Sequence, residues 1–519
     1  MKKTLSAFLA ICMVCIISGC TGKDVGVVTE NPEEVKDFSF ISLMLGSSHM
    51  EKWHENDVIT RVKCDKLRLS DESMEEYPLL SKAFDDYNDE GIKASKALMY
   101  DFEEEAKNLA GDMYNPAYCE AESCVYIQRA DNNIVSFLEG IFIYAGGVHP
   151  DYFWHGNNIN PETGEKISLS EVLKDTSVLP SLLEQKITEK YSYVTFYELS
   201  DTFGSYKEED FTWTIDYQGI NFWFSPYEIA AYSVGTLSCK IYFDEFPDMF
   251  FEEYTSSPES YVIRIPLGMD IDFDIDGDGT NDTVYAEKYP DQYGSYYMLY
   301  LAANGNGFTD EINYAYGFDV YLAHIGGKSY IYSDSVSDND YHMFCTYDLN
   351  KDNPAKTDEL YGTAFDNEYI EDGEEYGTVY TWVFNNPEKF RLETRLDILG
   401  TRSGKAAYKA GKDGGKPEMT DKAYTFDYIH DVKTLIPLEA ELLPESEKIN
   451  LPGGTSLTPY QTDGKSYVDL KNADGGIVRL DIDVSGWPVT VNGIPEDECN
   501  RQHRNTKDHK RLLSAVVCQ

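Results

Sequence analysis

The sequence is poor in basic residues, in cysteines and in long apolar runs. Its 519 residues include 44 Lys and Arg against 91 Asp and Glu, a formal net charge of −47 at pH 7. A chain this acidic repels polyanions, which excludes nucleic acid as a partner recruited by bulk electrostatics. Its one marked apolar run, Leu5–Ile17, is shorter than the ~20 residues of a membrane-spanning helix.

Cysteine and catalytic motifs are also scarce. Ten cysteines are spread too thinly for the dense disulfide framework of a small secreted domain. Cys119 and Cys124 are near enough in sequence either to pair or to remain two separate thiols, and neither has zinc-ligand spacing. The G-x-S-x-G, P-loop and dinucleotide-binding signatures are missing, so we predict no catalytic residue.

Aromatic residues, in contrast, are abundant. The chain has 40 Tyr, 25 Phe and 6 Trp, far more than a disordered acidic chain would carry. Because one hydrophobic core stops growing near about 250–300 residues, a folded chain of this length predicts two or three domains. Most of the tyrosines are expected to pack on half-buried sheet faces.

The first twenty residues resemble a bacterial lipoprotein signal. Lys2 and Lys3 precede the apolar run, which closes with Ile17-Ser18-Gly19-Cys20, a match to the lipobox. The alternative is an ordinary secretory signal with an incidental cysteine. We expect Cys20 to be the lipidated first residue of a protein on the outer face of the bacterial cytoplasmic membrane, because two or three acyl chains give lasting attachment.

The remaining pattern predicts an α+β region followed by a mostly β region. Helical spacing and alternating strands mix up to about residue 255, with an antiparallel sheet expected, and short aromatic strands dominate afterwards. Gly91 is expected to interrupt the helical stretch 71–112. The expected parts are a signal peptide at 1–19, a tether at 20–36, an α+β ligand-sensing domain at 37–255, an acidic β domain at 256–440, an SH3-like β module at 445–499 and an irregular tail at 500–519.

One loop has the composition of a calcium site. Carboxylates recur at positions 1, 3, 5 and 9 of the loop that starts at Asp274, glycine stands at position 6, and position 7 offers a backbone carbonyl. The alternative is an acidic turn satisfied by water. The flanks look extended, so the loop is similar to those between strands in β-propeller-type repeats rather than to an EF-hand. The predicted ligands of a structural calcium ion are Asp274, Asp276, Asp278, Thr280 and Asp282.

Three segments carry a resemblance to a known family. They are G-G-V-H-P at 146–150, P-E-T-G-E-K at 161–166 and W-F-S-P-Y-E-I-A-A-Y-S-V-G at 223–235. Their order resembles the extracytoplasmic domain of RsiV-type anti-sigma-V factors, and residues 40–135 are similar to the segment that precedes it in the peptidoglycan deacetylase PdaC. The resemblance implies ligand binding outside the membrane, with lysozyme as the ligand that such anti-sigma factors capture.

The candidate ligand contacts lie at the first of these segments. His149 stands in a tight turn, where it either bonds the backbone or contacts a ligand, and Asp151 and Tyr152 follow it. We therefore expect a lipid-anchored surface protein that binds a lysozyme-like protein or a cell-wall glycan. The alternative is a peptidoglycan-modifying enzyme or its accessory subunit.

Overall fold

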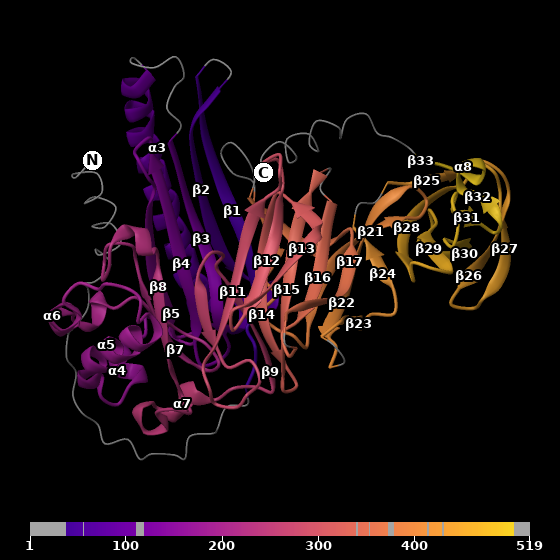
Figure 1. Ribbon diagram of the computed structural model, residues 1–519. Helices are drawn as coiled ribbons and strands as arrows, with labels where there is room; N and C mark the ends of the chain where they lie inside the picture. The colour runs from indigo at the N-terminus through magenta and orange to yellow at the C-terminus, as the bar shows by residue number, and fades with distance from the viewer. Residues whose placement is uncertain are drawn as a thin grey trace, which may run out of the picture. The chain divides into compact units, whose positions relative to one another are not determined.

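The computed structural model describes residues 38–502 except 55–56, 111–118, 339–340, 352, 372–377, 413–414 and 428–429. The chain divides into two compact units, Met1–Pro258 and Glu259–Gln519. The longer helices lie in the first unit, and the second consists mostly of strands (Figure 1). The predicted order, α+β and then mostly β, is confirmed.

A sheet with the strand order β1-β2-β3-β4-β5 forms one layer of the first unit. Its pairs are antiparallel except β2 with β3, which run parallel and depart from the predicted antiparallel sheet. The helix between β2 and β3 is the reason, because a long crossover returns the chain to the end where it started. The strands are β1 (Leu43–His54), β2 (Asp57–Leu69), β3 (Cys119–Ala130), β4 (Val135–Ala145) and β5 (Asp151–Ile159).

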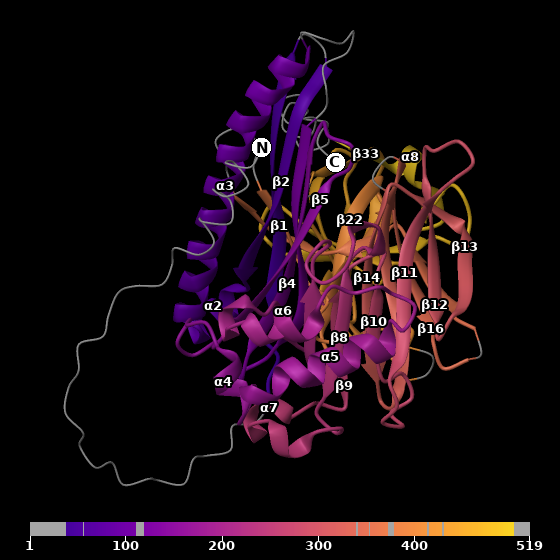
Figure 2. The same cartoon turned by 60° about the vertical axis from the view of Figure 1, so that its left-hand side comes forward.

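Two helices connect β2 to β3. After α2 (Asp71–Glu76), α3 (Pro78–Ala110) lies along β2 (Figure 2). The predicted interruption at Gly91 is wrong, since α3 passes through it without a break. A Cβ at Gly91 would lie 2.9 Å from the sulfur of Cys64 on β2. Gly91 therefore allows the helix to approach the sheet closely.

The rest of the first unit packs short helices against a second, three-stranded sheet. A capping box begins α4, where the Glu171 carboxylate accepts from the Ser168 backbone N–H at 2.8 Å. The helices are α4 (Leu169–Val172), α5 (Leu179–Lys190), α6 (Leu199–Ser205) and α7 (Glu252–Thr255), with 3-10 turns at Thr176–Val178, Glu208–Asp210, Tyr232–Val234 and Pro247–Met249. The strands are β6 (Trp213–Ile215), β7 (Gly219–Phe224) and β8 (Leu237–Tyr242).

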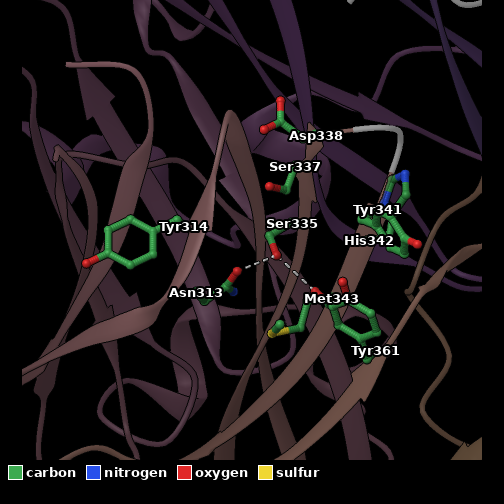
Figure 3. A pocket seen from close by; sticks show the side chains of 9 residues that line it. All are labelled: Asn313, Tyr314, Ser335, Ser337, Asp338, Tyr341, His342, Met343 and Tyr361. Carbon is green, nitrogen blue, oxygen red and sulfur yellow. Dashed lines mark hydrogen bonds between the residues drawn. The ribbon is translucent and has the colours of Figure 1, made fainter. Parts of the chain in front are cut away.

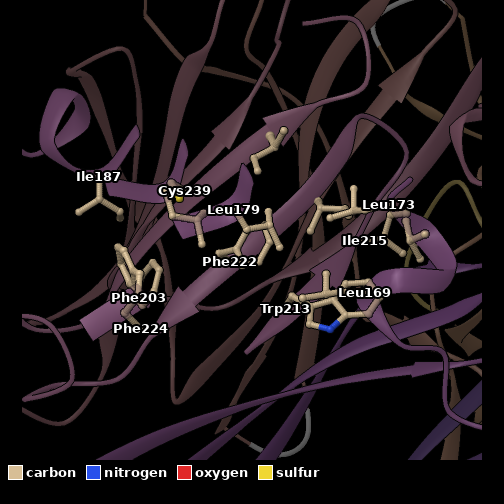
Figure 4. Close-up of a cluster of buried hydrophobic side chains, with 14 of the residues drawn as sticks. Leu169, Leu173, Leu179, Ile187, Phe203, Trp213, Ile215, Phe222, Phe224 and Cys239 are labelled. Atoms are coloured by element: carbon tan, nitrogen blue, oxygen red, sulfur yellow. The ribbon is translucent and has the colours of Figure 1, made fainter. Parts of the chain in front are cut away.

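A large apolar core joins these helices to the three strands (Figure 4). Every residue of β7 is buried, because helices cover one face of this sheet and other parts of the first unit cover the other. Phe222 and Phe224 of β7 meet Leu179 and Ile187 of α5 and Phe203 of α6 in this core. The core fixes the loops at the ends of β7 and β8.

The second unit begins with two sheets. The four-stranded sheet follows chain order, and the five-stranded sheet has the order β17-β16-β15-β14-β9. The first contains β10 (Asp270–Phe273), β11 (Asp282–Pro290), β12 (Tyr297–Ala303) and β13 (Asn306–Ala315). The second contains β9 (Ser260–Ile265), β14 (Gly317–Ile325), β15 (Lys328–Ser337), β16 (Tyr341–Asp348) and β17 (Ala355–Tyr361).

A branched sheet of 14 strands makes up the rest of the second unit. Its strands are β18 (Thr363–Phe365), β21 (Phe390–Asp397), β22 (Thr401–Ala410), β23 (Pro417–Met419), β24 (Tyr424–Phe426), β25 (Val432–Thr434), β26 (Leu438–Leu443), β27 (Glu447–Leu451), β28 (Ser456–Thr462), β29 (Tyr467–Lys471), β30 (Ile477–Asp483), β31 (Thr490–Val491), β32 (Ile494–Pro495) and β33 (Asn500–Gln502). The remaining elements are the strands β19 (Asn367–Glu371) and β20 (Thr378–Trp382) and the helix α8 (Glu496–Cys499).

The strands of 445–499 do not form the SH3-like barrel that the sequence favours. Among the described residues they belong to the branched sheet, which is not closed, and β24 of the preceding region pairs with β28. A shared apolar core also joins Leu396 and Ile398 to Leu457 and Val478. The short strands and glycine turns were visible in the sequence, but their long-range pairing was not.

Two further findings concern cysteines and membrane helices. Cys119 and Cys124 lie on the same strand, β3, five residues apart, so their side chains point to opposite faces about 16 Å from each other and cannot pair. Within the ranges that the structure describes, none of the helices has both the length and the apolar composition of a membrane span.

Candidate functional site

The G-G-V-H-P segment is the hairpin turn between β4 and β5 of the first unit. Gly146 has φ 72°, a conformation that glycine adopts without a Cβ clash. The Tyr144 hydroxyl donates to the Gly147 carbonyl at 3.2 Å, and Nδ1 of His149 donates to the Pro150 carbonyl at 3.0 Å. His149 thus makes the backbone bond expected of a turn histidine, while its ring remains exposed.

A second loop, 225–236, reaches the same turn from the end of β7. The Glu228 carboxylate holds this loop by accepting from the Ser225 backbone N–H at 2.8 Å and from the Tyr206 hydroxyl at 3.0 Å. Ile229 and Ala230 anchor it in the core described above. The fixed loop then presents aromatic side chains on either side of these anchors.

Three rings from the turn and the loop form a cluster that we call the aromatic trio: His149, Tyr227 and Tyr232. The His149 ring stacks on Tyr232, with centroids 3.9 Å apart and planes at 27°, and Tyr227 lies 5.3 Å from Tyr232. The Tyr232 hydroxyl donates to the Pro150 carbonyl at 2.5 Å, which ties the loop to the turn. Two segments 80 residues apart in sequence therefore build one surface.

Tyr227 has an unusual backbone. Its φ is 72°, the left-handed region that is unfavourable for a bulky residue, and its side chain is 56% exposed. Such strain costs about 1–2 kcal/mol and persists where the surrounding structure imposes it, often at binding sites. In this backbone conformation the Tyr227 ring is exposed on the surface beside His149.

The structure brings the other two predicted contacts, Asp151 and Tyr152, close to Tyr232. Burial, followed by the Asp151 carboxylate and Tyr227, raises the pKa of the Tyr232 hydroxyl. Burial, followed by Tyr232 and Glu122, raises the pKa of Tyr152. Tyr232 is thus the centre of the site, although the sequence analysis did not name it as a contact. Its place in the quoted 223–235 motif was the only available signal.

The predicted calcium loop joins β10 to β11 in the second unit. These strands pair as an antiparallel hairpin, with Phe273 opposite Asp282, so the extended flanks expected from the sequence are confirmed. Gly277 has φ 74° and Gly279 has φ 80°, which lets the loop turn back on itself. The chain therefore closes the loop around its first aspartate.

Three of the five predicted ligands of this loop come together. Carboxylate oxygens of Asp274, Asp276 and Asp282 all lie within 4.8 Å of one another, close to twice the 2.3–2.6 Å of a Ca²⁺–oxygen bond. Asp274 also accepts backbone N–H bonds from Gly277 at 2.8 Å and Gly279 at 2.9 Å. These donors orient its carboxylate, and the three residues form one acidic cluster.

The Asp278 carboxylate, another predicted ligand, is not part of this cluster. It accepts instead from the Thr280 backbone N–H at 2.7 Å, and both residues are exposed. Asn304 of the neighbouring strands, which the sequence analysis missed, donates to Asp282 at 2.6 Å. Cys20, the predicted lipidation site, lies outside the described residues.

Comparisons with known proteins place a domain of unknown function in the first unit. Residues 170–244 match the family model described as protein of unknown function (DUF3298). This DUF3298 domain contains Tyr227 and Tyr232, whereas His149, Asp151 and Tyr152 precede it. No curated protein matches the chain.

Two solved DUF3298 structures are similar to part of the chain. A crystal structure of a family member from Bacteroides fragilis is 15% identical, covering 41% of this chain and 96% of that one, with a TM-score of 0.31. A family member from Pseudomonas aeruginosa is 11% identical, covering 42% of this chain and 98% of that one, with a TM-score of 0.29.

Proposed function

We propose that the chain is a lipid-anchored protein of the outer face of the bacterial cytoplasmic membrane, in which the aromatic trio captures an extracellular ligand. The observation that carries the proposal is the exposed, strained Tyr227 beside the stacked pair of His149 and Tyr232. Exposed tyrosines are typical anchors of interfaces because they combine a large apolar ring with a polar tip. Asp151 and Tyr152 complete the binding surface.

Lysozyme is the ligand that we propose first. The resemblance to RsiV-type anti-sigma-V factors, with a PdaC-like segment before it, supports this choice. So does the charge of the chain, because a protein at −47 accelerates its encounter with a basic partner. A cell-wall glycan, which also stacks on aromatic faces, is the competing ligand and an outcome of the test below.

The acidic loop of the second unit is proposed as a structural calcium site. Three oriented carboxylates would repel one another without a cation, and their oxygen spacing suits Ca²⁺. Asp274, Asp276 and Asp282 would hold the ion. Its role there would be to fix the β10–β11 hairpin, since a cation that binds only the folded state stabilises that state.

The capture proposal can be tested by titration calorimetry on the full chain with hen egg-white lysozyme at ~0.15 M salt. We expect Tyr227→Gly to weaken binding about tenfold or more, because a central interface tyrosine is lost. The same change should leave the free energy of unfolding unchanged or higher, since glycine relieves the left-handed strain. Tyr193→Ala is the matched control, because Tyr193 is 80% exposed in the same unit but lies outside the trio.

The outcomes separate the alternatives. Equal lysozyme affinity in wild type and Tyr227→Gly would contradict capture by the trio. Binding of a chitin hexasaccharide, but not lysozyme, in a Tyr227-dependent manner would replace the protein ligand by a glycan. Hydrolysis or deacetylation of purified peptidoglycan by the wild-type chain would contradict a purely binding function.

A further inference from the structure

A hollow of about 280 Å³ opens on the second unit among the ends of β13, β15, β16 and β17 (Figure 3). It is far in sequence from the aromatic trio and shares no residue with the acidic loop. Ligand pockets usually measure roughly 300–1,000 Å³, so this one has room for a single ring-sized group rather than a long chain. Its floor has buried polar groups and its rim has an exposed aromatic ring, both of which are typical of ligand-binding pockets.

A bulge in β13 supplies part of the lining. On β12, Tyr297 pairs with Ala315 of β13 and Leu299 pairs with Asp310, so residues 311–314 stand opposite one residue of β12. Bulges re-aim side chains and are frequent beside functional sites. This one releases Asn313 and Tyr314 from the regular ladder, and both line the hollow.

The floor contains buried polar groups with unused bonding capacity. Asn313 is 2% exposed, and its Oδ1 accepts from the Ser335 hydroxyl at 3.0 Å. Its amide nitrogen has two hydrogens, and the bonds found in the described part of the chain engage it only with the weakly accepting Cys345 sulfur at 3.8 Å. One buried N–H therefore remains for a ligand acceptor, and buried donors of this kind call for a partner.

A tyrosine ring forms part of the rim. Tyr361 is 63% exposed, whereas the ring of Tyr314 points away from the other lining side chains (Figure 3). Tyr361 stacks on Tyr341, with centroids 5.3 Å apart and planes at 23°, and the Arg395 guanidinium lies 4.9 Å from the Tyr341 ring centre. The guanidinium and the stacked partner hold this aromatic platform in place, so a flat apolar face is offered to a ligand at the mouth.

The charges around the hollow disfavour anions. The described residues that line it include no Lys or Arg, whereas the Asp338 carboxylate and the His342 ring are part of the lining. Asp338 accepts from the hydroxyls of Tyr296 and Tyr316, which hold the pKa of this carboxyl below its usual range, so it stays charged near neutral pH. A carboxylate at the mouth accepts from hydroxyl groups but repels a second acid.

We propose that this hollow binds one pyranose ring of an uncharged saccharide. The C–H face of a pyranose is flat and apolar and fits against a tyrosine ring, as at Tyr361, while its rim of hydroxyls both donates and accepts. At the floor the Asn313 amide donates to those hydroxyls. The Ser335 oxygen accepts from them, because its own hydrogen is directed to Asn313 and Met343. Asp338 accepts from them at the mouth. The site is independent of the function proposed for the first unit.

The test is saturation-transfer NMR followed by titration calorimetry on the full chain with N,N′-diacetylchitobiose, cellobiose and maltose. Glucuronic acid serves as the anionic probe. We expect at least one uncharged disaccharide to bind, and Tyr361→Ala to weaken its binding about tenfold or more. Tyr293→Ala is the matched control, because Tyr293 is 79% exposed in the same unit and does not line the hollow.

Three results would overturn the proposal. The first is that none of the three disaccharides binds. The second is that the disaccharide affinity is equal in Tyr361→Ala and in the Tyr293→Ala control. The third is that glucuronic acid binds as tightly as the uncharged sugars. Because Tyr361 is partly exposed, its truncation is not expected to unfold the chain, and a circular dichroism spectrum of the variant verifies this.

Discussion

Arg129 stabilises the first unit through a fully buried ion pair. Its side chain is fully buried on β3 and forms an ion pair with the equally buried Asp131 at 2.6 Å. The guanidinium also donates to the backbone carbonyls of Tyr254 at 2.7 Å and Ser256 at 3.2 Å. One side chain thus ties the β1–β5 sheet to the end of the unit, more than 120 positions later.

Arg129→Ala leaves a charged carboxylate buried without its partner. Breaking a buried pair in this way costs about 3–5 kcal/mol, because the remaining charge has lost its solvation and its counter-ion. With a urea m-value of about 2–3 kcal/mol/M for a unit of this size, the unfolding midpoint should fall by about 1–2 M. The conservative variant Asp131→Asn should cost a similar amount, since it strands the guanidinium instead.

The assay is urea unfolding of the full chain followed by tryptophan fluorescence. Arg61→Ala is the control, because Arg61 pairs with Glu51 at 2.9 Å on the partly exposed surface of the same sheet and should cost at most about 1 kcal/mol. In addition, the free energy lost in the double variant Arg129→Ala/Asp131→Asn should be well below the sum of the losses in the two single variants. Equal midpoints for Arg129→Ala and Arg61→Ala would refute this reasoning.

Three further predictions follow from the loops and the chain start. At ~10 mM calcium we expect the melting temperature to rise in wild type and in the surface control Asp474→Asn but not in Asp276→Ala; calorimetry without any wild-type shift would mean an ordinary turn. Cys20→Ala should lose labelled palmitate and leave the membrane fraction, and retained label would end the lipid-anchor hypothesis. Burial raises the pKa of Asp463, but hydrogen bonds led by the Ser466 hydroxyl and backbone N–H bring it from its ordinary 3.8 down to about 2. Because the folded-state pKa is depressed, this stabilisation exists above about pH 4 and disappears as the pH falls toward 2, so Asp463→Asn should flatten the acid limb of a stability–pH curve; an unchanged limb would contradict it.

Local patterns allowed much of the fold to be predicted. The α+β region before the mostly β region and the extended flanks of the loop at Asp274 depend on residues close in sequence, and both are found. Gly91 misled the prediction because its role is a close approach to Cys64 on another element. The open branched sheet was missed for the same reason, since its strand pairs join segments that no local pattern connects.

In the candidate sites, too, features within one segment were predictable from the sequence, whereas contacts between distant segments were not. The acidic loop is one contiguous segment, so the sequence predicted the clustering of Asp274, Asp276 and Asp282, and missed Asn304 because it comes from a neighbouring hairpin. The aromatic trio draws on two distant segments, and only a resemblance connected them beforehand. The strained backbone of Tyr227 has no sequence signal at all, because neither its neighbours nor its residue type predicts a positive φ.

Surface plasmon resonance with immobilised full chain tests the central claim, capture by the aromatic trio, most directly. Lysozyme and an unrelated protein of similar basic charge, cytochrome c, are compared across a salt series, because the screening length falls to about 8 Å at 0.15 M and removes long-range attraction. We predict that lysozyme binding persists at 0.15 M salt, that cytochrome c binding disappears, and that Tyr227→Gly accelerates lysozyme dissociation while Tyr193→Ala does not. Equal binding of both basic proteins, or loss of lysozyme binding by 0.15 M, would contradict the account.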